Sequence, residues 1–450
     1  MHMVRRLIIA SNRLPVSVRE EHGVLSLSRS NGGLATALAS LFDQDSSLWV
    51  GWTGYRCRLS ASDIESLDLP PYVAPVNLTE KEISGYYDHF SNGILWPLAH
   101  GLPVTSPFSE DLWQDVQSVT CRFADTIEAT VTPSDIIWIH DYHLMLLPGM
   151  LRHRGIKNRI GFFLHTPFPP AKFAAKIPHF PEIMKSLLQA DLIGLQVGRD
   201  IRRFKKVLAA LPAAPPRLPL VKSFPIGIDF DSFDSPIDAA AIAKRAAELK
   251  KPLSGQTVIF SLSRLDYTKG IITQLRAYER LLTTHAGRDV VYRLNVAPSR
   301  ESMLEYRELR EEIEELAASI NKRFATKTWR PVVYSYDNMG PQEITAWFRI
   351  ADVHLNTPVA DGMNLIAKEY IAARSQPGAL VISSTMGAAR QLNEALIVPP
   401  NNITATARAL QDALALPAGE KTRRWQALRH EVQTRQASGW AKDFLNTLQP

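Results

Sequence analysis

The chain has 450 residues, 45% of them hydrophobic and 21% charged, and a net charge of +6 at pH 7. This length exceeds what one hydrophobic core usually supports, so we expect two domains of about 200 residues each. No apolar run reaches the roughly 18 residues of a membrane span, and the apolar stretch at residues 7–10 is too short for a signal peptide. No long basic tract with interleaved aromatics predicts nucleic-acid binding. Cys57 and Cys121 form neither a disulfide framework nor a metal-ligand pattern, so we expect a cytoplasmic protein. The two preceding observations add that neither a membrane nor a nucleic acid is an expected partner.

The chain opens with strand patterns separated by glycines. Residues 7–10 and 48–52 are apolar runs typical of buried strands, and Gly32 and Gly33 lie between them, before leucines at helical spacing. A glycine pair at a helix start lets the backbone approach a ligand and would form half of a phosphate cradle. A plain loop entering a helix fits the same residues, so both interpretations stay open.

Polar side chains follow the next two predicted strands. The apolar run at residues 135–139 leads to Asp141, and the run at residues 159–164 ends at His165. Open α/β sheets bind ligands at the carboxyl ends of their strands, so we expect these two side chains at one site. Two aromatic residues upstream, Tyr87 and Trp96, are either part of the core or a wall on which a sugar ring packs.

The second half of the chain alternates strands and helices, which predicts a parallel sheet with helical crossovers. It follows a linker-like segment rich in alanine, proline and leucine at residues 209–220, and residues 229–233 read as a loop. The predicted strands are residues 258–263, 290–297, 332–335, 353–356 and 380–383. A long helix between the second and third of these carries an apolar stripe, and a short amphipathic helix is expected over residues 440–448.

Two cations follow the first strand of this half. Arg264 and Lys269 stand five residues apart after the strand at residues 258–263, so they are able to hold a diphosphate from two sides. A surface ion pair between Arg264 and Asp266 is the alternative.

The segment from residue 352 to 370 joins a strand, a glycine turn and a helix. Backbone N–H groups and a helix N-terminus would therefore meet at one point, which favours an anion. Asp361 in the turn and Glu369 one helical turn beyond Leu365 add carboxylates suited to sugar hydroxyls. An ordinary turn with an Asp N-cap and a solvated Glu fits the segment equally well.

These elements predict an α/β protein with two doubly wound, Rossmann-like domains facing a central cleft. We expect an N-terminal acceptor-binding domain over residues 1–222 and a C-terminal nucleotide-sugar-binding domain over residues 223–430. The helix within residues 431–450 is expected to pack back on the first domain.

Ordered motifs then identify a family. They are Ser11-Asn12-Arg13-Leu14-Pro15, Asn31-Gly32-Gly33-Leu34, Gly51-Trp52, Leu95-Trp96-Pro97, His140-Asp141-Tyr142-His143, Arg264-Leu265-Asp266-Tyr267-Thr268-Lys269-Gly270 and Asp361-Gly362-Met363-Asn364-Leu365 with Lys368-Glu369. Over essentially the whole chain, this pattern resembles the trehalose-6-phosphate synthases, which are retaining glycosyltransferases of the GT-B architecture.

The resemblance implies a reaction. Glucose would move from a nucleotide-glucose donor, usually UDP-glucose, to glucose 6-phosphate, giving trehalose 6-phosphate and a nucleoside diphosphate. No resident cofactor or metal is implied, because UDP-glucose is a co-substrate and no Asp-x-Asp metal motif lies in the right place. A separate trehalose-6-phosphate phosphatase is expected, and a homo-oligomer is compatible with the family.

The resemblance also implies roles for individual residues. The catalytic set would be Asp141, His165, Arg264, Lys269 and Asp361. Donor binding would fall to Gly33, Arg264, Lys269, Asp361, Gly362, Met363, Asn364, Leu365 and Glu369, with Glu369 on the ribose hydroxyls. Acceptor binding would fall to Arg13, Tyr87, Trp96, Asp141 and Arg300, with the two arginines on its phosphate.

One departure bears on the acceptor. After Leu95-Trp96-Pro97 the family usually continues with an aromatic and His-Tyr, whereas this chain has Leu98-Ala99-His100-Gly101. A glycosyltransferase that uses another phosphorylated acceptor, such as glycerol 3-phosphate or a cyclitol phosphate, is therefore the second hypothesis. A non-catalytic sugar-phosphate sensor is the third.

Overall fold

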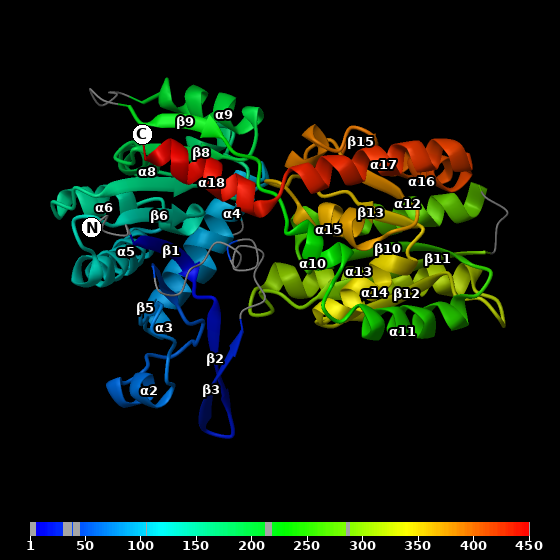
Figure 1. The fold of residues 1–450 in the computed structure, drawn as a ribbon, viewed down its shortest axis with the longest axis horizontal. Helices are drawn as coiled ribbons and strands as arrows, with labels where there is room; N and C mark the ends of the chain where they lie inside the picture. The colour runs from blue at the N-terminus through cyan, green and yellow to red at the C-terminus, as the bar shows by residue number, and fades with distance from the viewer. Residues whose placement is uncertain are drawn as a thin grey trace. The chain divides into compact units, whose positions relative to one another are not determined.

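The structure is a computed structural model that describes residues 6–29, 38, 46–104, 106–211, 218–284 and 289–449. The chain divides into two compact units. Unit 1 comprises Met1–Ile226 and Ala437–Pro450, and unit 2 comprises Gly227–Gln436. Both ends of the chain therefore belong to unit 1, while unit 2 is continuous in sequence (Figure 1).

Unit 1 is built on a parallel sheet. Among the described residues its strand order is β5-β4-β1-β6-β7-β8-β9, with every neighbouring pair parallel. The strands are β1 (Leu7–Arg13), β4 (Ser47–Trp52), β5 (Val73–Pro75), β6 (Ile136–His140), β7 (Arg159–Phe163), β8 (Leu192–Leu195) and β9 (Leu220–Ser223), and an antiparallel hairpin of β2 (Val16–Glu21) and β3 (Val24–Arg29) projects from the end of β1. Strand β6 is buried at every position, including His140 at its end, and its first four residues are an apolar run that predicts a buried strand.

The helices of unit 1 connect these strands. Those whose bounds lie within the described residues are α2 (Ala61–Ser66), α3 (Glu80–Glu82), the π-helical η1 (Ile83–Leu95), α4 (Trp96–Ala99), α5 (Glu110–Thr130), the 3₁₀ turn η2 (Tyr142–Leu144), α6 (Leu147–His153), α7 (Ala171–Ala174), α8 (Phe180–Leu187), α9 (Gly198–Leu208) and α18 (Ala437–Leu448). Helix α18, at the carboxyl end of the chain, packs on β7 and β8. Its Phe444 ring stacks 4.7 Å from Trp138 of β6, so the tail helix completes the core of this unit.

Unit 2 repeats the same plan. Its sheet has the order β12-β11-β10-β13-β14-β15 among the described residues, again all parallel. The strands are β10 (Thr257–Arg264), β11 (Val290–Ala297), β12 (Val332–Tyr336), β13 (Val353–Asn356), β14 (Ala379–Ser383) and β15 (Leu396–Val398). The helices are α10 (Phe230–Asp234), α11 (Ala239–Lys250), η3 (Lys251–Leu253), η4 (Tyr267–Lys269), α12 (Ile271–Thr284), α13 (Leu304–Phe324), α14 (Pro341–Ile350), α15 (Leu365–Ala373), η5 (Gly387–Arg390), α16 (Ile403–Ala415) and α17 (Ala418–Thr434).

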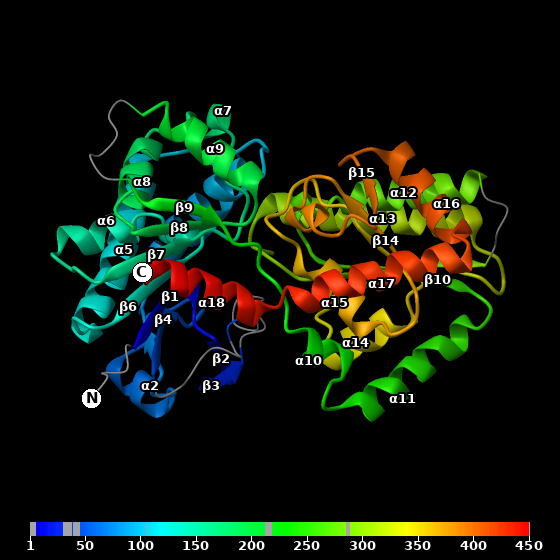
Figure 2. The same cartoon turned by 45° about the horizontal axis from the view of Figure 1, so that its top comes forward.

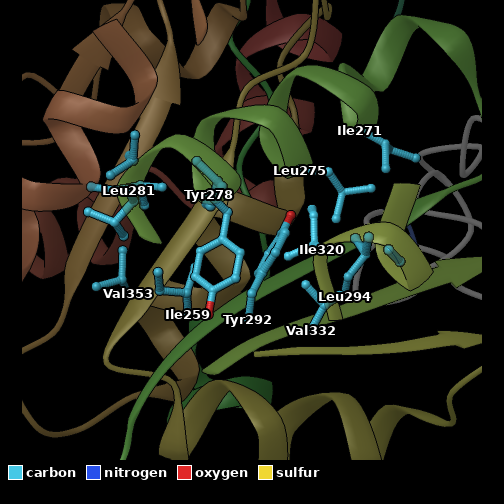
Figure 3. Packing of buried hydrophobic residues seen from close by; sticks show 14 of the residues in the cluster. Ile259, Ile271, Leu275, Tyr278, Leu281, Tyr292, Leu294, Ile320, Val332 and Val353 are labelled. Carbon is cyan, nitrogen blue, oxygen red and sulfur yellow. The ribbon is translucent and has the colours of Figure 1, made fainter. Parts of the chain in front are cut away.

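Helices cover both faces of this second sheet. Helix α12 packs against α13 and α16, whereas α14 packs against α11 and α15, and α15 against α17 (Figure 2). Between α12, α13 and the strands lies a dense apolar core, in which the rings of Tyr278 and Tyr292 lie next to each other (Figure 3). Both hydroxyls are satisfied, since Tyr278 donates to the Val290 carbonyl (2.8 Å) and Tyr292 to Ser261 Oγ (2.9 Å).

The doubly wound α/β class predicted from the sequence is confirmed, and one local prediction is wrong. Residues 229–233, expected to form a loop, are the N-cap and first four residues of helix α10, because the carboxylate of Asp229 accepts a hydrogen bond from Ser232 N and caps the helix start. The helix predicted after Gly32-Gly33 lies outside the described residues, apart from Leu38.

Both strand orders reverse direction at a definite place. In unit 1 the chain runs outward from β1 to β4 and β5, and then returns to β6 on the other side of β1. In unit 2 the same reversal falls between β10 and β13. Ligands of open α/β sheets bind outside the carboxyl ends of the strands at such reversals. Each unit therefore has one place where a ligand is expected.

Candidate functional site

The sequence-predicted residues of unit 2 gather at the reversal between β10 and β13. Lys269 follows β10, Asp361 follows β13, and Lys269 Nζ lies 2.8 Å from Asp361 Oδ2. The two turns approach closely because Gly270, at φ +69°, has no side chain: a Cβ there would collide with the carbonyl oxygen of Thr357. A cation suited to a diphosphate and a carboxylate suited to a sugar, 92 residues apart, thus become neighbours.

Asn364 organises the turn between Asp361 and helix α15. It has φ +71°, it is the N-cap of α15, and its side chain accepts from Ala367 N. Its Nδ2 donates to Asp361 Oδ2 at 3.1 Å, and its Oδ1 accepts from Asn356 Nδ2 at 2.6 Å. The helix is therefore capped by Asn364 and not by Asp361, whose carboxylate pairs with Lys269 and accepts from the capping residue.

Glu369 lies one helical turn into α15 and is half-buried. Burial raises the pKa of its carboxyl to about 7. The sequence-based alternative of a solvated Glu does not describe it. The neighbouring predicted residues Gly362, Met363 and Leu365 form the backbone of the same turn and helix start, with Gly362 and Met363 buried.

Three positively charged side chains surround the buried carboxylate of Asp266 at this end of the sheet. Asp266 is 1% exposed, so burial alone would raise its pKa, but the charges of Arg300, Lys269 and Arg264 outweigh burial and hold the pKa below its ordinary value. Asp266 Oδ2 lies 3.5 Å from Arg300 Nη1, and Asp266 Oδ1 accepts from Thr268 N. Three cations converge on one buried anion, which is the electrostatic setting that favours a multiply charged ligand.

Arg300 is fixed by more than this ion pair. It has φ +52°, an uncommon conformation for a residue with a side chain, and its Nη1 donates to Tyr306 Oη at 2.5 Å. Its guanidinium therefore has a defined position in unit 2, whereas Arg13, the other predicted phosphate ligand, belongs to unit 1.

In unit 1 the predicted acceptor residues stand around an aromatic cluster. The Arg13 guanidinium lies over the Trp52 ring, 4.8 Å from its centroid, and the Tyr87 ring meets Trp52 edge-on at 5.5 Å. Tyr87 also stacks on His143 at 5.9 Å. Gly54, at φ +87°, leaves room for the guanidinium, because a Cβ there would collide with Arg13. Trp96, the third predicted acceptor residue, is buried and lies 4.3 Å from His100, centroid to centroid.

Asp141 and His165 meet at the carboxyl ends of β6 and β7. Asp141 has φ +72° with a β-like ψ of 169°, and its Oδ1 accepts from His165 N at 3.2 Å. A non-glycine residue in this region is strained, and strain of this kind concentrates at functional sites. The structure thus brings these two predicted catalytic residues together.

One predicted site residue is not described by the structure, and three residues near the site had no predicted role. Gly33, predicted on the donor phosphates, lies outside the described residues. The roles assigned to all these residues stay predictions. The sequence reasoning gave no role to Trp52, Gly54 or His140, although each stands in or beside a quoted motif. Their proximity to Arg13 and His165 follows only from the folded sheet.

The described residues contain neither a membrane-spanning helix nor a cluster of metal-binding side chains. In that part of the chain no helix is both long and apolar enough to cross a membrane. Nor do three or more His, Cys, Asp or Glu side chains of the described residues gather as a metal ion would require.

Comparison with known proteins covers almost the whole chain. The model of glycosyltransferase family 20 matches residues 5–450. The bifunctional trehalose-6-phosphate synthase/phosphatase of Thermoproteus tenax is 36% identical over 98% of this chain, which spans only 63% of that protein. The 56 kDa subunit of the UDP-forming alpha,alpha-trehalose-phosphate synthase of Kluyveromyces lactis is 35% identical over 98% of this chain and 95% of its own length.

A solved structure is similar throughout. The UDP-forming alpha,alpha-trehalose-phosphate synthase of Burkholderia xenovorans, in complex with glucose-6-phosphate, has a TM-score of 0.89 and 31% identity. The match covers 99% of this chain and 100% of that one.

Proposed function

This chain belongs to glycosyltransferase family 20, and on that premise we propose that it transfers glucose from a nucleotide-glucose donor, UDP-glucose, to glucose 6-phosphate. The products are trehalose 6-phosphate and UDP, and the anomeric configuration of the donor glucose is retained. The names of the similar proteins support this choice of substrates, since they are UDP-forming trehalose-phosphate synthases and one is a complex with glucose-6-phosphate.

The observation that carries the proposal is the 2.8 Å pairing of Lys269 with Asp361 at the reversal point of unit 2. A nucleotide-sugar has a diphosphate and a sugar joined at one bond, and this pair supplies a partner for each side of that bond. Arg264 and the amides that begin α15 add positive charge on the phosphate side.

The chemistry follows from charge development. The bond between the anomeric carbon and the diphosphate oxygen breaks, so positive charge builds on the sugar ring and negative charge on the leaving group. Preorganised cations stabilise the leaving diphosphate, and this is the largest catalytic contribution expected. The anomeric hydroxyl of glucose 6-phosphate forms the new bond on the same face, and its proton passes to the departing phosphate oxygen. The proposal invokes no resident cofactor, because Lys269 and Arg264 supply the positive charge.

The departure at residues 98–101 is compatible with this acceptor. His100 Nδ1 lies 2.7 Å from the carbonyl of Trp96, and Gly101 has φ +74°, so the segment forms a closed turn that supports Trp96. The predicted acceptor residues Arg13 and Tyr87 contact Trp52, which lies outside this segment.

Two further assignments belong to the proposal. The family match occupies residues 5–450, so a phosphatase that acts on the product would lie outside these residues. The free thiols of Cys57 and Cys121 suit a reducing compartment, which supports the cytoplasm as the place of reaction.

The test is release of UDP from UDP-glucose by the purified chain, with and without glucose 6-phosphate, with the sugar product identified by mass. Release that requires glucose 6-phosphate and yields a phosphorylated disaccharide is expected. Glycerol 3-phosphate and a cyclitol phosphate serve as alternative acceptors, and transfer to either in place of glucose 6-phosphate would reject the proposed acceptor. Ligand binding without any turnover would favour a sensor.

Substitution of Lys269 tests whether this cation stabilises the leaving diphosphate. Lys269→Ala should lower kcat/KM by about 100-fold to 1000-fold, since it removes one preorganised group from the leaving diphosphate. The matched control is Arg276→Ala, which removes an exposed cation of α12 in the same unit and should leave the rate unchanged. Equal rates for the two variants would contradict the role given to Lys269.

A further inference from the structure

His165 is not alone at the end of β7. Its Nε2 lies 3.1 Å from Nδ1 of His140, the last residue of the neighbouring strand β6, and the two rings stack at 5.4 Å with 26° between their planes. Because β6 and β7 are paired in parallel, with His140 opposite Phe163, the strand register places His140 beside the chain as it leaves β7. A neutral imidazole has one N–H and one lone pair, so this contact must fix which nitrogen of each ring has the proton.

The surroundings of His140 decide the direction of this hydrogen bond. His140 is fully buried, and its Nε2 has no hydrogen-bond partner among the described residues. The rings around it include Trp138 at 4.5 Å and Trp440 at 6.5 Å, centroid to centroid, and the indole N–H groups of both are also buried without an acceptor in the described chain.

A lone pair on His140 Nε2 suits this environment better than a proton would. A proton on Nε2 would add a third unsatisfied N–H to a buried region that already contains two, and buried N–H groups without acceptors are rare. A lone pair at the same atom leaves only an acceptor without a partner, which is less unusual in a buried region than an unsatisfied donor. The proton of His140 therefore belongs on Nδ1, where His165 Nε2 accepts it.

From this geometry we infer that His140 is a positioning residue, which donates from Nδ1 to His165 Nε2 and thereby confines His165 to the tautomer protonated at Nδ1. His165 then presents an N–H donor, and not an acceptor, to a ligand at the carboxyl end of β7. If the proposed function is correct, the group that receives this hydrogen bond is a hydroxyl oxygen of a sugar.

Two other features hold the pair in place. Asp141 Oδ1 accepts the backbone N–H of His165, which fixes the main chain of His165 while His140 fixes its ring. Trp440 of α18 lies 6.0 Å from the His165 ring and 5.0 Å from Phe163, so the tail helix closes the apolar side of the pair. Burial lowers the pKa of His165 to about 3 and also lowers the pKa of His140, so both rings are neutral when they make the contact.

The direct test is a long-range ¹H–¹⁵N correlation spectrum of the full chain labelled with ¹⁵N-histidine, because the two neutral tautomers give different cross-peak patterns. His165→Gln assigns the signals of His165 among the 12 histidines. His165 should show the Nδ1–H pattern in the unmodified chain. An Nε2–H pattern would overturn the inference, and this readout requires neither substrate nor turnover.

Variants of His140 test the consequence. His140→Leu removes the donor, so the His165 signals should move toward the Nε2–H form that imidazole prefers in water, and kcat should fall by about 10-fold to 100-fold with a smaller change in the donor KM. His140→Asn keeps an N–H close to the Nδ1 position and should restore both readouts. A His140→Leu chain that retains the Nδ1–H pattern and full kcat would contradict the inference.

A matched control separates positioning from packing. His354 of β13 is another fully buried, neutral histidine whose Nε2 has no partner in the described chain. His354→Leu should lower the free energy of unfolding about as much as His140→Leu while the His165 signals stay unchanged. If both variants change those signals, His140 acts through general packing and the inference fails. Absence of transfer by the unmodified chain would reject the proposed function alone, because the tautomer is read without it.

Discussion

The carboxyl of Glu369 is held where its charge is disfavoured. Burial raises its pKa to about 7, yet the role predicted for it, accepting hydrogen bonds from ribose hydroxyls, requires the carboxylate. The pKa of this acid is raised, so the charged form is lost as the pH falls through 7. We expect the KM for the nucleotide-glucose, at saturating acceptor, to rise toward tenfold per pH unit below about pH 6.5.

Glu369→Gln is the matched control for this pH dependence. It keeps the shape and one acceptor oxygen but cannot titrate, so its donor KM should be higher at pH 8 and nearly flat between pH 5.5 and 8. A pH profile that survives in the variant would assign the titration to another group. Folding itself responds in the opposite sense: the folded carboxyl binds a proton between its ordinary pKa of 4.5 and about 7, so the stability it contributes declines as the pH rises through that window.

Arg300 and Asp266 form an ion pair whose side chains are 8% and 1% exposed. Removing the arginine leaves a buried carboxylate with weaker compensation, a change that typically costs about 3–5 kcal/mol. Lys269 and Arg264 still face Asp266, so Arg300→Ala should lower the free energy of urea unfolding by about 3 kcal/mol. Adding Asp266→Asn should recover part of this loss, and a double variant less stable than Arg300→Ala would contradict the pairing.

Among the elements, helix α18 depends on two glycines of the sheet. A Cβ at Gly161 of β7 would lie 2.6 Å from a ring carbon of Phe444, and one at Gly194 of β8 would lie 2.7 Å from the same ring. Phe444 is fully buried against them. Phe444→Ala should therefore cost about 3–5 kcal/mol in urea unfolding, and Gly161→Ala should destabilise the chain by displacing the helix. Asn446→Ala, on the exposed side of α18, is the control and should change little.

The elements also show what the sequence could and could not predict. Strands such as β6 and β14 each contain a run of four apolar residues before a polar one, so their local pattern suffices. The β2–β3 hairpin is absent from the sequence-based expectations, although its turn, His22-Gly23 with φ of 53° and 78°, is a recognisable hairpin signal. The π-helical η1, which carries Tyr87, has no comparable sequence signature.

For the site, the sequence predicts residue types but not the contacts between them. Motifs identify Lys269 and Asp361, because their residue types suit phosphates and sugars. Their 2.8 Å contact depends on the pairing of β10 with β13, which no local pattern encodes. The contact between His140 and His165 could not be predicted either. The two residues are 25 positions apart, and only the pairing of β6 with β7 brings them together.

At the scale of the whole molecule, the two units differ in how the chain builds them. Unit 2 is one continuous segment, Gly227–Gln436, with its own sheet, helices and core. Expressed alone, it should unfold cooperatively in urea and bind UDP, which isothermal titration calorimetry would measure, without transferring glucose. An unfolded fragment would show that its core requires unit 1.

A chain that ends at Gln436 makes the complementary test. This chain lacks α18 but contains all of unit 2, so unit 1 should lose stability and unit 2 should not. Two urea transitions are expected in the intrinsic tryptophan fluorescence, and replacing Trp138 by Phe should reduce the amplitude of the less stable one. A single transition unchanged from that of the full chain would contradict the assignment of α18 to the core of unit 1.

The position of α18 also sets an order of events during synthesis. The ribosome makes the sheet of unit 1 first and the whole of unit 2 next, and only then the helix that covers Gly161 and Gly194. While unit 2 is translated, the apolar surface of β7 and β8 that α18 later covers stays exposed. Exposed apolar surface of this kind binds chaperones and is accessible to proteases. Nascent chains arrested before residue 437 should therefore be captured by chaperones through their amino-terminal half, even though that half was synthesised first.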